Sequence, residues 1–270
     1  MTKLNLNKIV VYLPFLKRAF AASLKLGMPP WEMIRYLAAV TKNARYQIGF
    51  PENFLLNRKI NRFKTNMGWV YFRDNHVDPA TLTELVENQY EFSKLSNDGT
   101  YVDIGGGIGM AAKLFSFYNP KCKIFCFEPV AENAELIKLN CSKSRVYTCA
   151  IGKNRSRLVF HIHPISSMAF KDEINAGSRR TMEVFPLDFF VEKFGKRIGM
   201  LKIDTEGSEV DILSGGQKIL DRTNEVRMET HSAELHEQAK EILIKNRFII
   251  HKEAINKSGY GYIFAKKKVD

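Results

Sequence analysis

The chain has 270 residues, a formal net charge of +12, four cysteines and 45% hydrophobic residues. This length accommodates one α/β domain with an appendage, and no apolar run reaches the roughly 18 residues that span a bilayer. The nearest run, residues 9–16, is broken by Pro14, so neither a secretory leader nor a membrane anchor is expected. The cysteines match no zinc-binding spacing and are expected to be reduced core residues, which predicts a cytoplasmic protein.

The positive charge is concentrated in residues 1–66. This segment carries 12 Lys and Arg against two acidic residues, a net +10, whereas residues 67–270 carry 29 against 27, a net +2. Aromatic residues are interleaved with the basic ones. Such a surface suits anionic lipid headgroups, nucleic acid or an acidic partner, but a helical cap with a solvated basic face explains it equally well. We therefore predict a basic N-terminal extension over 1–66 and a second domain over 67–270.

Apolar residues recur at helical spacing in the extension, and Gly-Pro segments interrupt them. The pattern predicts three helices, over residues 13–26, 31–40 and 54–63. A short strand is predicted over 69–72. A helix should then run from Asp78 to about Lys94, because Asp is a favoured N-cap and Pro79 suits the first helical position.

From residue 100 onward, apolar strands alternate with helical segments, which is typical of a doubly wound parallel sheet. Five parallel strands are predicted, over residues 100–104, 123–127, 145–150, 199–203 and 225–230. Residues 246–252 and 260–266 follow as an antiparallel hairpin, because only a tight connection joins them. The predicted fold is therefore α/β and Rossmann-like, with a mostly parallel seven-stranded sheet, a C-terminal antiparallel hairpin and a helical N-terminal extension.

Extra material lies between the third and fourth of these strands. Residues 157–163 and 181–187 have β-type composition, and residues 164–180 between them are rich in polar and small residues. This polar stretch is a candidate substrate loop. His161 and His163 alternate onto one strand face, but two histidines without a third convergent ligand are a weak metal signal, so no metal is assigned.

A glycine loop follows the first parallel strand. Gly105, Gly107 and Gly109 allow sharp turns and close approach of a ligand, and Glu128 comes nineteen residues later at the end of the next strand. A carboxylate there suits two ribose hydroxyls. The spacing G-x-G-x-G, with Asp103 two residues before it, disfavours the diphosphate of NAD and suits a cofactor with an amino group and a sulfonium. The pattern thus favours S-adenosylmethionine, although a tight strand-to-helix turn would also explain the loop.

Acid–base residues follow the last two parallel strands. Asp204 and Glu206 come directly after one strand, and Glu229 and His231 end the next. Parallel strands place these residues at one edge of the sheet, where open α/β sheets bind ligands. We predict that they are catalytic, with Asp204 also near the cofactor. His231 is the candidate general base because an ordinary histidine pKa lies near neutrality, yet it could equally be a polar residue that starts a helix.

The motifs and their order resemble those of the FkbM-type methyltransferases over roughly residues 69–231. The matching segments are residues 102–109, 127–129, 150–152, 187–188 and 201–209. The resemblance implies a class I S-adenosylmethionine-dependent O-methyltransferase, often acting on sugar hydroxyls, and adds Pro129 and Ala150 to the cofactor site. Gly107 departs from the family, which usually has Asn there. The basic segment 1–66 lies outside the shared pattern.

Three other functions fit the sequence less well. A nucleic-acid amino-methyltransferase needs Asn or Asp before Pro-Pro-aromatic, but Met28 occupies that place in the only similar segment. A non-catalytic cofactor-binding module would not need the intact acids, and an NAD oxidoreductase is disfavoured by the loop spacing. The expected partner is therefore a small-molecule or glycan acceptor, with residues 1–66 as a possible contact with the inner face of an anionic membrane; the oligomeric state stays open.

Overall fold

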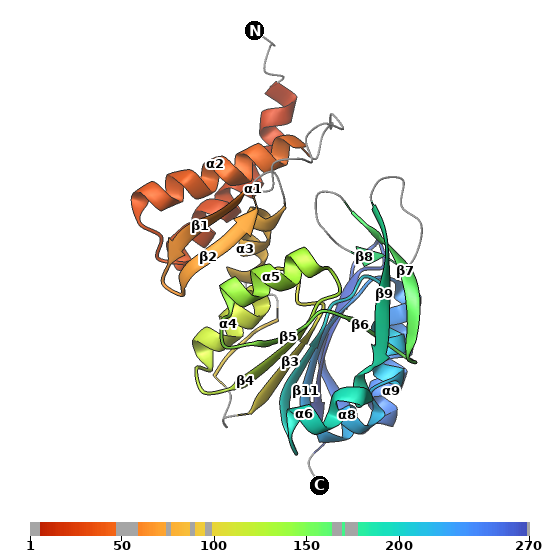
Figure 1. Cartoon of the computed structure of the whole chain (residues 1–270). Coiled ribbons are helices and arrows are strands. Elements are labelled where there is room, and N and C mark those ends of the chain that lie inside the picture. Colours follow the sequence, from red (N-terminus) through yellow and green to blue (C-terminus); the bar gives the residue numbers. More distant parts are fainter. Residues whose placement is uncertain are drawn as a thin grey trace. The chain divides into compact units, whose positions relative to one another are not determined.

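The structure is a computed structural model of the whole chain (Figure 1). It describes residues 6–46, 59–73, 77–86, 90–94, 99–163, 169–170 and 178–268. The chain forms two compact units, Met1–Glu91 and Phe92–Asp270. The sequence placed a boundary after residue 66 instead, inside a hairpin that belongs to the first unit. A methyltransferase domain beginning at residue 67 stays a prediction.

In its described residues, the first unit combines three helices with a two-stranded hairpin. Its elements are α1 (Leu6–Lys25), α2 (Pro30–Tyr46), β1 (Ile60–Thr65), β2 (Gly68–Arg73) and α3 (Asp78–Val86). The buried Tyr36 ring of α2 packs edge-on against Phe63 of β1 at 5.4 Å between centroids. Phe63 in turn stacks on Phe72 of β2 at 4.2 Å. The first two predicted helices and the predicted strand are confirmed.

The third predicted helix, over residues 54–63, is wrong in its described part. Residues 60–63 form strand β1, which pairs antiparallel with β2. Phe63 and Thr65 alternate inward, and the short turn to Gly68 closes the hairpin. The predicted helix from Asp78 is also too long, since α3 ends at Val86 and residues 91–94 are not helical.

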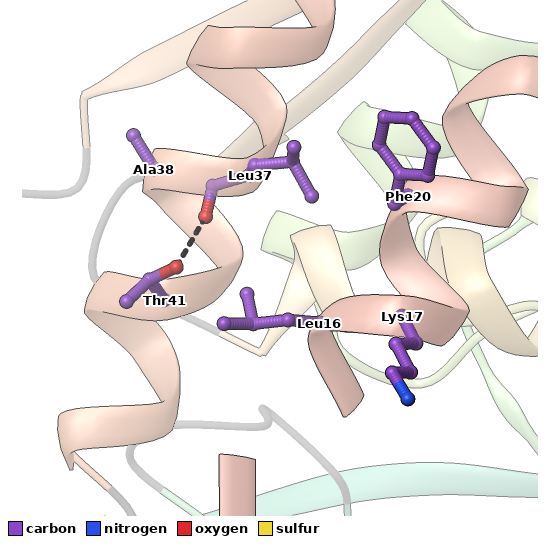
Figure 2. Close-up of a pocket in the computed structure, with 6 residues that line it drawn as sticks. All are labelled: Leu16, Lys17, Phe20, Leu37, Ala38 and Thr41. Atoms are coloured by element: carbon purple, nitrogen blue, oxygen red, sulfur yellow. Dashed lines mark hydrogen bonds between the residues drawn. The ribbon is translucent and has the colours of Figure 1, made fainter. Parts of the chain in front are cut away.

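Helices α1 and α2 leave an open hollow of about 600 Å³ between them. Figure 2 shows Leu16 and Phe20 of α1 facing Leu37 of α2 across it. Large apolar side chains are also exposed on these two helices; they are Phe20, Leu24, Trp31 and Ile34. The unit therefore presents apolar side chains beside exposed lysines such as Lys17 and Lys25.

A seven-stranded sheet forms the centre of the second unit. In spatial order its strands are β12 (Phe248–Ile255), β13 (Gly261–Lys267), β11 (Thr223–Thr230), β10 (Ile198–Ile203), β3 (Thr100–Ile104), β4 (Lys123–Phe127) and β5 (Arg145–Tyr147). Only the pairings of β13 are antiparallel. The predicted α/β fold, its parallel strands and its C-terminal hairpin are confirmed, although the strand predicted over 145–150 ends at Tyr147.

Helices cover both faces of this sheet (Figure 1). On one face lie α4 (Met110–Tyr118) and α5 (Ala131–Asn140); on the other lie the 3-10 turn η2 (Leu187–Phe190), α6 (Val191–Phe194), α7 (Glu209–Ser214), α8 (Gln217–Arg222) and α9 (Ala233–Lys245). Buried strand residues such as Val102 and Leu201 share a core with Ile212 of α7 and Leu243 of α9. This packing fixes the carboxyl ends of β3, β4, β10 and β11, where the candidate residues lie.

A smaller sheet holds the extra material between β5 and β10. Its strands, in the order β6 (Ala150–Gly152), β9 (Ser178–Pro186), β7 (Ser156–Ile162) and β8 (Ala169–Phe170), include the two predicted for this region. Most of the candidate substrate loop, residues 164–180, lies outside the described residues. All four cysteines are buried and form no disulfide. Among the described helices, none is both long and apolar enough to cross a membrane.

Candidate active site

The glycine loop, residues 105–109, connects β3 to α4 at the carboxyl edge of the sheet. The backbone N–H groups of Gly105 and Gly106 both donate to the Phe127 carbonyl at 3.0 Å, which ties the loop to the end of β4. Gly105 has φ +77°, and a Cβ there would collide with the Asp204 carbonyl oxygen. Only glycine fits this position, so the loop lies directly against the segment that follows β10.

Gly107 and Glu128 form the open side of the loop. Gly107 N–H donates to Glu128 Oε2 at 2.9 Å, and a Cβ on Gly107 would meet nothing within 4 Å. Glu128 Oε1 accepts from Val130 N–H at 3.0 Å and from Asn133 Nδ2 at 3.2 Å. Burial raises the pKa of Glu128 to about 7, although these hydrogen bonds oppose the shift. A glycine-rich loop beside a carboxylate held by three hydrogen bonds suits a nucleoside; the predicted contact of Glu128 with the ribose stays a prediction.

A buried lysine that the sequence analysis missed links this loop to the neighbouring strand. Lys202 Nζ of β10 lies 3.1 Å from Asp103 Oδ1 and 3.6 Å from Asp204 Oδ2, and it donates to the Gly105 carbonyl at 2.7 Å. Burial lowers the pKa of Lys202, but the two carboxylates outweigh it and raise the pKa, so the side chain is charged. The sequence did contain a signal for this ion pair, because a lysine within the apolar run of residues 201–203 needs a buried partner.

Asp103 is fully buried, so it acts on the loop through Lys202. Its carboxylate oxygens form an ion pair with Lys202 but no well-aligned hydrogen bond in the described structure. Burial raises the pKa of Asp103, and Lys202 opposes that shift. A direct contact between Asp103 and a cofactor therefore stays a prediction.

Three of the four acid–base residues predicted at one edge of the sheet, Asp204, Glu206 and His231, converge there. We call Asp204, Glu206, Glu209 and His231 the rim cluster. His231 Nε2 lies 3.3 Å from Glu206 Oε2 and 3.9 Å from Asp204 Oδ1, and His231 Nδ1 lies 2.8 Å from Glu209 Oε1. Glu209, at the start of α7, is fully buried. The sequence analysis assigned no functional role to Glu209, because its partner His231 is 22 residues away in the chain.

The carboxylates around His231 change its protonation. Burial lowers its pKa, but the hydrogen bond with Glu209 and the charge of Glu206 outweigh this and raise the pKa to about 9. Burial raises the pKa of Glu206, and His231 opposes that shift. The near-neutral pKa on which the general-base hypothesis rested therefore does not hold in this arrangement, and the catalytic role of His231 stays a prediction.

The remaining predicted residues lie around these two groups. Gly109 precedes α4 as its N-cap, and Pro129 follows Glu128 at the end of β4. Ala150 lies in the smaller sheet, on β6, and Glu229 is half-buried near the end of β11. Their roles stay predictions.

Potential metal ligands also converge in the rim cluster. Within the described part of the chain, the only group of three such side chains is Asp204, Glu206 and His231. His161, which is buried on β7, and His163 are not part of it. The sequence analysis considered only His161 and His163 as metal ligands and assigned no metal, because no third ligand converged with them.

Comparison with known proteins agrees with this geometry. The "Methyltransferase FkbM domain" family matches residues 103–262. A 2-O-methyltransferase, NoeI, from Sinorhizobium fredii strain NGR234 is 26% identical over 161 residues, 52% of this chain and 66% of that protein. Methyltransferase 1 from Beauveria bassiana is 24% identical over 177 residues, 52% of this chain and 70% of that protein. The match thus spans about two thirds of the length of these relatives.

Among solved structures, a precorrin-6y C5,15-methyltransferase from Geobacter metallireducens is 13% identical at a TM-score of 0.44, over 69% of this chain and 89% of that one. The family match covers more than half of the chain and includes the glycine loop, Glu128 and the rim cluster. The chain therefore belongs to the FkbM-domain methyltransferase family, with a Rossmann-like methyltransferase fold and S-adenosylmethionine as its cofactor.

Proposed function

We propose that this protein methylates a hydroxyl group on a sugar, a glycan or a related small molecule. One observation carries the proposal: the glycine loop and the rim cluster are in direct contact, because Lys202 joins the Gly105 carbonyl to the Asp204 carboxylate. A cofactor site and an acid–base site therefore share one edge of the sheet. The relative NoeI is a 2-O-methyltransferase, which supports oxygen as the atom that is methylated.

Different residues would bind the cofactor and the acceptor. The backbone at Gly107 and the Glu128 carboxylate would hold the nucleoside part of S-adenosylmethionine, which supplies a methyl group on a sulfonium when it is bound. The rim cluster would bind the acceptor hydroxyl, with Asp204 and Glu206 as the candidate groups that take up its proton and His231 as a hydrogen-bonding partner of these carboxylates. Glu209 would fix the orientation of His231 from behind.

Methyl transfer to defined acceptors tests the proposal. Radiolabelled S-adenosylmethionine is incubated with a panel of free sugars, glycosides, amines and nucleic acids, and labelled products are located by mass spectrometry. We expect label on a hydroxyl oxygen of a sugar-like acceptor, and loss of turnover in Asp204→Asn. Glu135→Gln, which alters an exposed carboxylate on α5, is the matched control. Label on nitrogen or on nucleic acid alone would refute O-methylation of a small acceptor.

We also propose that the first unit contacts an anionic membrane surface on the cytoplasmic face. The net +10 of residues 1–66 and the exposed Trp31 and Ile34 on α2 support this, since basic and apolar side chains together suit a lipid interface. Each lysine near such a surface contributes about 1 kcal/mol. Sedimentation with phosphatidylserine vesicles should weaken in Lys17→Glu and with rising salt. Full-length protein that ignores these vesicles at low salt would exclude the contact.

A further inference from the structure

The rim cluster carries more negative charge than its own side chains neutralise. Counting Asp103 with the cluster, four carboxylates surround two basic side chains, Lys202 and His231. Even with the imidazole counted as a cation, these side chains alone carry more negative than positive charge. Carboxylates gathered in a partly buried place repel one another, and a bound cation lowers that repulsion.

The positions of the side chains suit a divalent ion. Metal–ligand bonds of about 2.0–2.2 Å place neighbouring ligand atoms roughly 3–3.5 Å apart. His231 Nε2 lies 3.3 Å from Glu206 Oε2 and 3.9 Å from Asp204 Oδ1, and one atom from each of the three side chains lies within 4.8 Å of the others. Small side-chain rotations would therefore bring all three atoms onto one ion. The side chains of Asp204 and Glu206 are 29% and 21% exposed, which leaves a path of entry.

A second, independent observation comes from Glu209. This side chain is fully buried, and its Oε1 atom accepts the Nδ1 proton of His231 and the Gly207 N–H. Because the carboxylate holds a proton on Nδ1, Nε2 is the nitrogen that faces Asp204 and Glu206 and that would release its proton to bind an ion. A buried carboxylate behind the distal nitrogen of a histidine is the arrangement that accompanies metal-ligating histidines in proteins. The Oε2 atom of Glu209 is buried and has no hydrogen-bond partner in the described residues.

We propose that Asp204, Glu206 and His231 bind a divalent first-row cation of the Mn²⁺ or Zn²⁺ class, with Glu209 as the positioning residue for His231. Two carboxylates and one imidazole suit these ions better than Mg²⁺, which prefers oxygen ligands alone. This inference adds an ion to the proposed active site. It rests on the proposed function only where it gives that ion a role in methyl transfer. A hydroxyl that binds such an ion releases its proton more readily, so the ion would serve the acceptor rather than the cofactor.

Direct binding measurements test the site without any acceptor. The full-length protein is treated with EDTA and dialysed, and then Mn²⁺ is titrated with detection of unbound Mn²⁺ by electron paramagnetic resonance; Zn²⁺ and Mg²⁺ are titrated by calorimetry. We expect one equivalent of Mn²⁺ or Zn²⁺, with Mg²⁺ binding more weakly. Wild-type protein that binds no equivalent at millimolar concentration overturns the proposal.

Variants identify the ligands. Glu209→Gln should weaken the binding of Mn²⁺ by about 10- to 100-fold, and His231→Ala should weaken it further. Glu206→Gln, at a partly exposed side chain, gives a second ligand variant in case His231→Ala does not fold. Glu135→Gln on the surface of α5 is the matched control and should bind as wild type does. Equal binding by wild type, His231→Ala and Glu206→Gln would refute the site.

Titration with S-adenosylhomocysteine on the same samples separates this inference from the proposed function. If S-adenosylhomocysteine binds but no cation does, the metal site is refuted and the cofactor site stands. If Mn²⁺ binds in one equivalent and the ligand variants lose it while S-adenosylhomocysteine fails to bind, the metal site is confirmed and the methyltransferase proposal falls.

Discussion

The glycine loop and the rim cluster lie side by side but balance their charges differently. At the loop, Asp103 has Lys202, and Glu128 accepts hydrogen bonds from Gly107, Val130 and Asn133. At the rim, three carboxylates lie around the His231 imidazole, and Lys202 Nζ lies 3.6 Å from one of them, Asp204. The loop is thus held in shape by its own contacts, whereas the carboxylates at the rim repel one another. Removing a charged side chain should therefore lower the free energy of unfolding at the loop but change it little at the rim.

The largest expected effect is that of Lys202→Met. Without the ammonium group, the buried Asp103 carboxylate is left without its cation, which should cost about 3–5 kcal/mol of unfolding free energy. Urea denaturation measures this loss. The double variant Asp103→Asn with Lys202→Met should recover part of it, because no charge is then buried alone. A double variant as unstable as the sum of both single variants would show that the pair is not coupled.

Gly105→Ala should have the second-largest effect on stability. Alanine at φ +77° is strained, and its Cβ would collide with the Asp204 carbonyl oxygen, so the loop and the rim segment must move apart. Gly107→Ala is the matched control, since its φ is also positive at +53° but no atom lies near the added Cβ. We expect Gly105→Ala to be less stable than Gly107→Ala by about 1–3 kcal/mol, measured by thermal denaturation. Equal stability of the two would mean that the loop does not need its contact with Asp204.

Glu128→Gln tests the cofactor role of the loop. Glutamine keeps the shape of the side chain but loses the charge that strengthens hydrogen bonds from ribose hydroxyls, which contribute about 1.5–3 kcal/mol each. Calorimetric titration with S-adenosylhomocysteine should show roughly a 10- to 100-fold loss of affinity for each such bond that weakens. Unchanged affinity in a folded variant would leave Glu128 with only its internal role of holding Gly107 and Val130.

The sequence predicted the fold better than it predicted the charge interactions at the site. Parallel strands such as β3 and β10 are buried on both faces, so they appear as apolar runs that need no tertiary information. The short segment 60–63 was assigned to a helix because a few apolar residues fit both the helical period of 3.6 residues and the strand period of two. Lys202 and Glu209 escaped functional assignment for a different reason. The role of Lys202 depends on its contact with Asp103, and that of Glu209 on its contact with His231; only folding brings these pairs close.

The smallest effect on stability is expected at the rim. Glu206→Gln removes one of the three carboxylates around His231 while keeping the shape of the side chain. Because those carboxylates repel one another in a largely buried place, the metal-free variant should be as stable as wild type within about 0.5 kcal/mol, or slightly more stable. Its methyl-transfer rate should nevertheless fall. Urea denaturation in EDTA, together with the transfer assay, checks both statements. A loss of several kcal/mol here would show that Glu206 is a structural partner of His231, and that the difference between loop and rim does not exist.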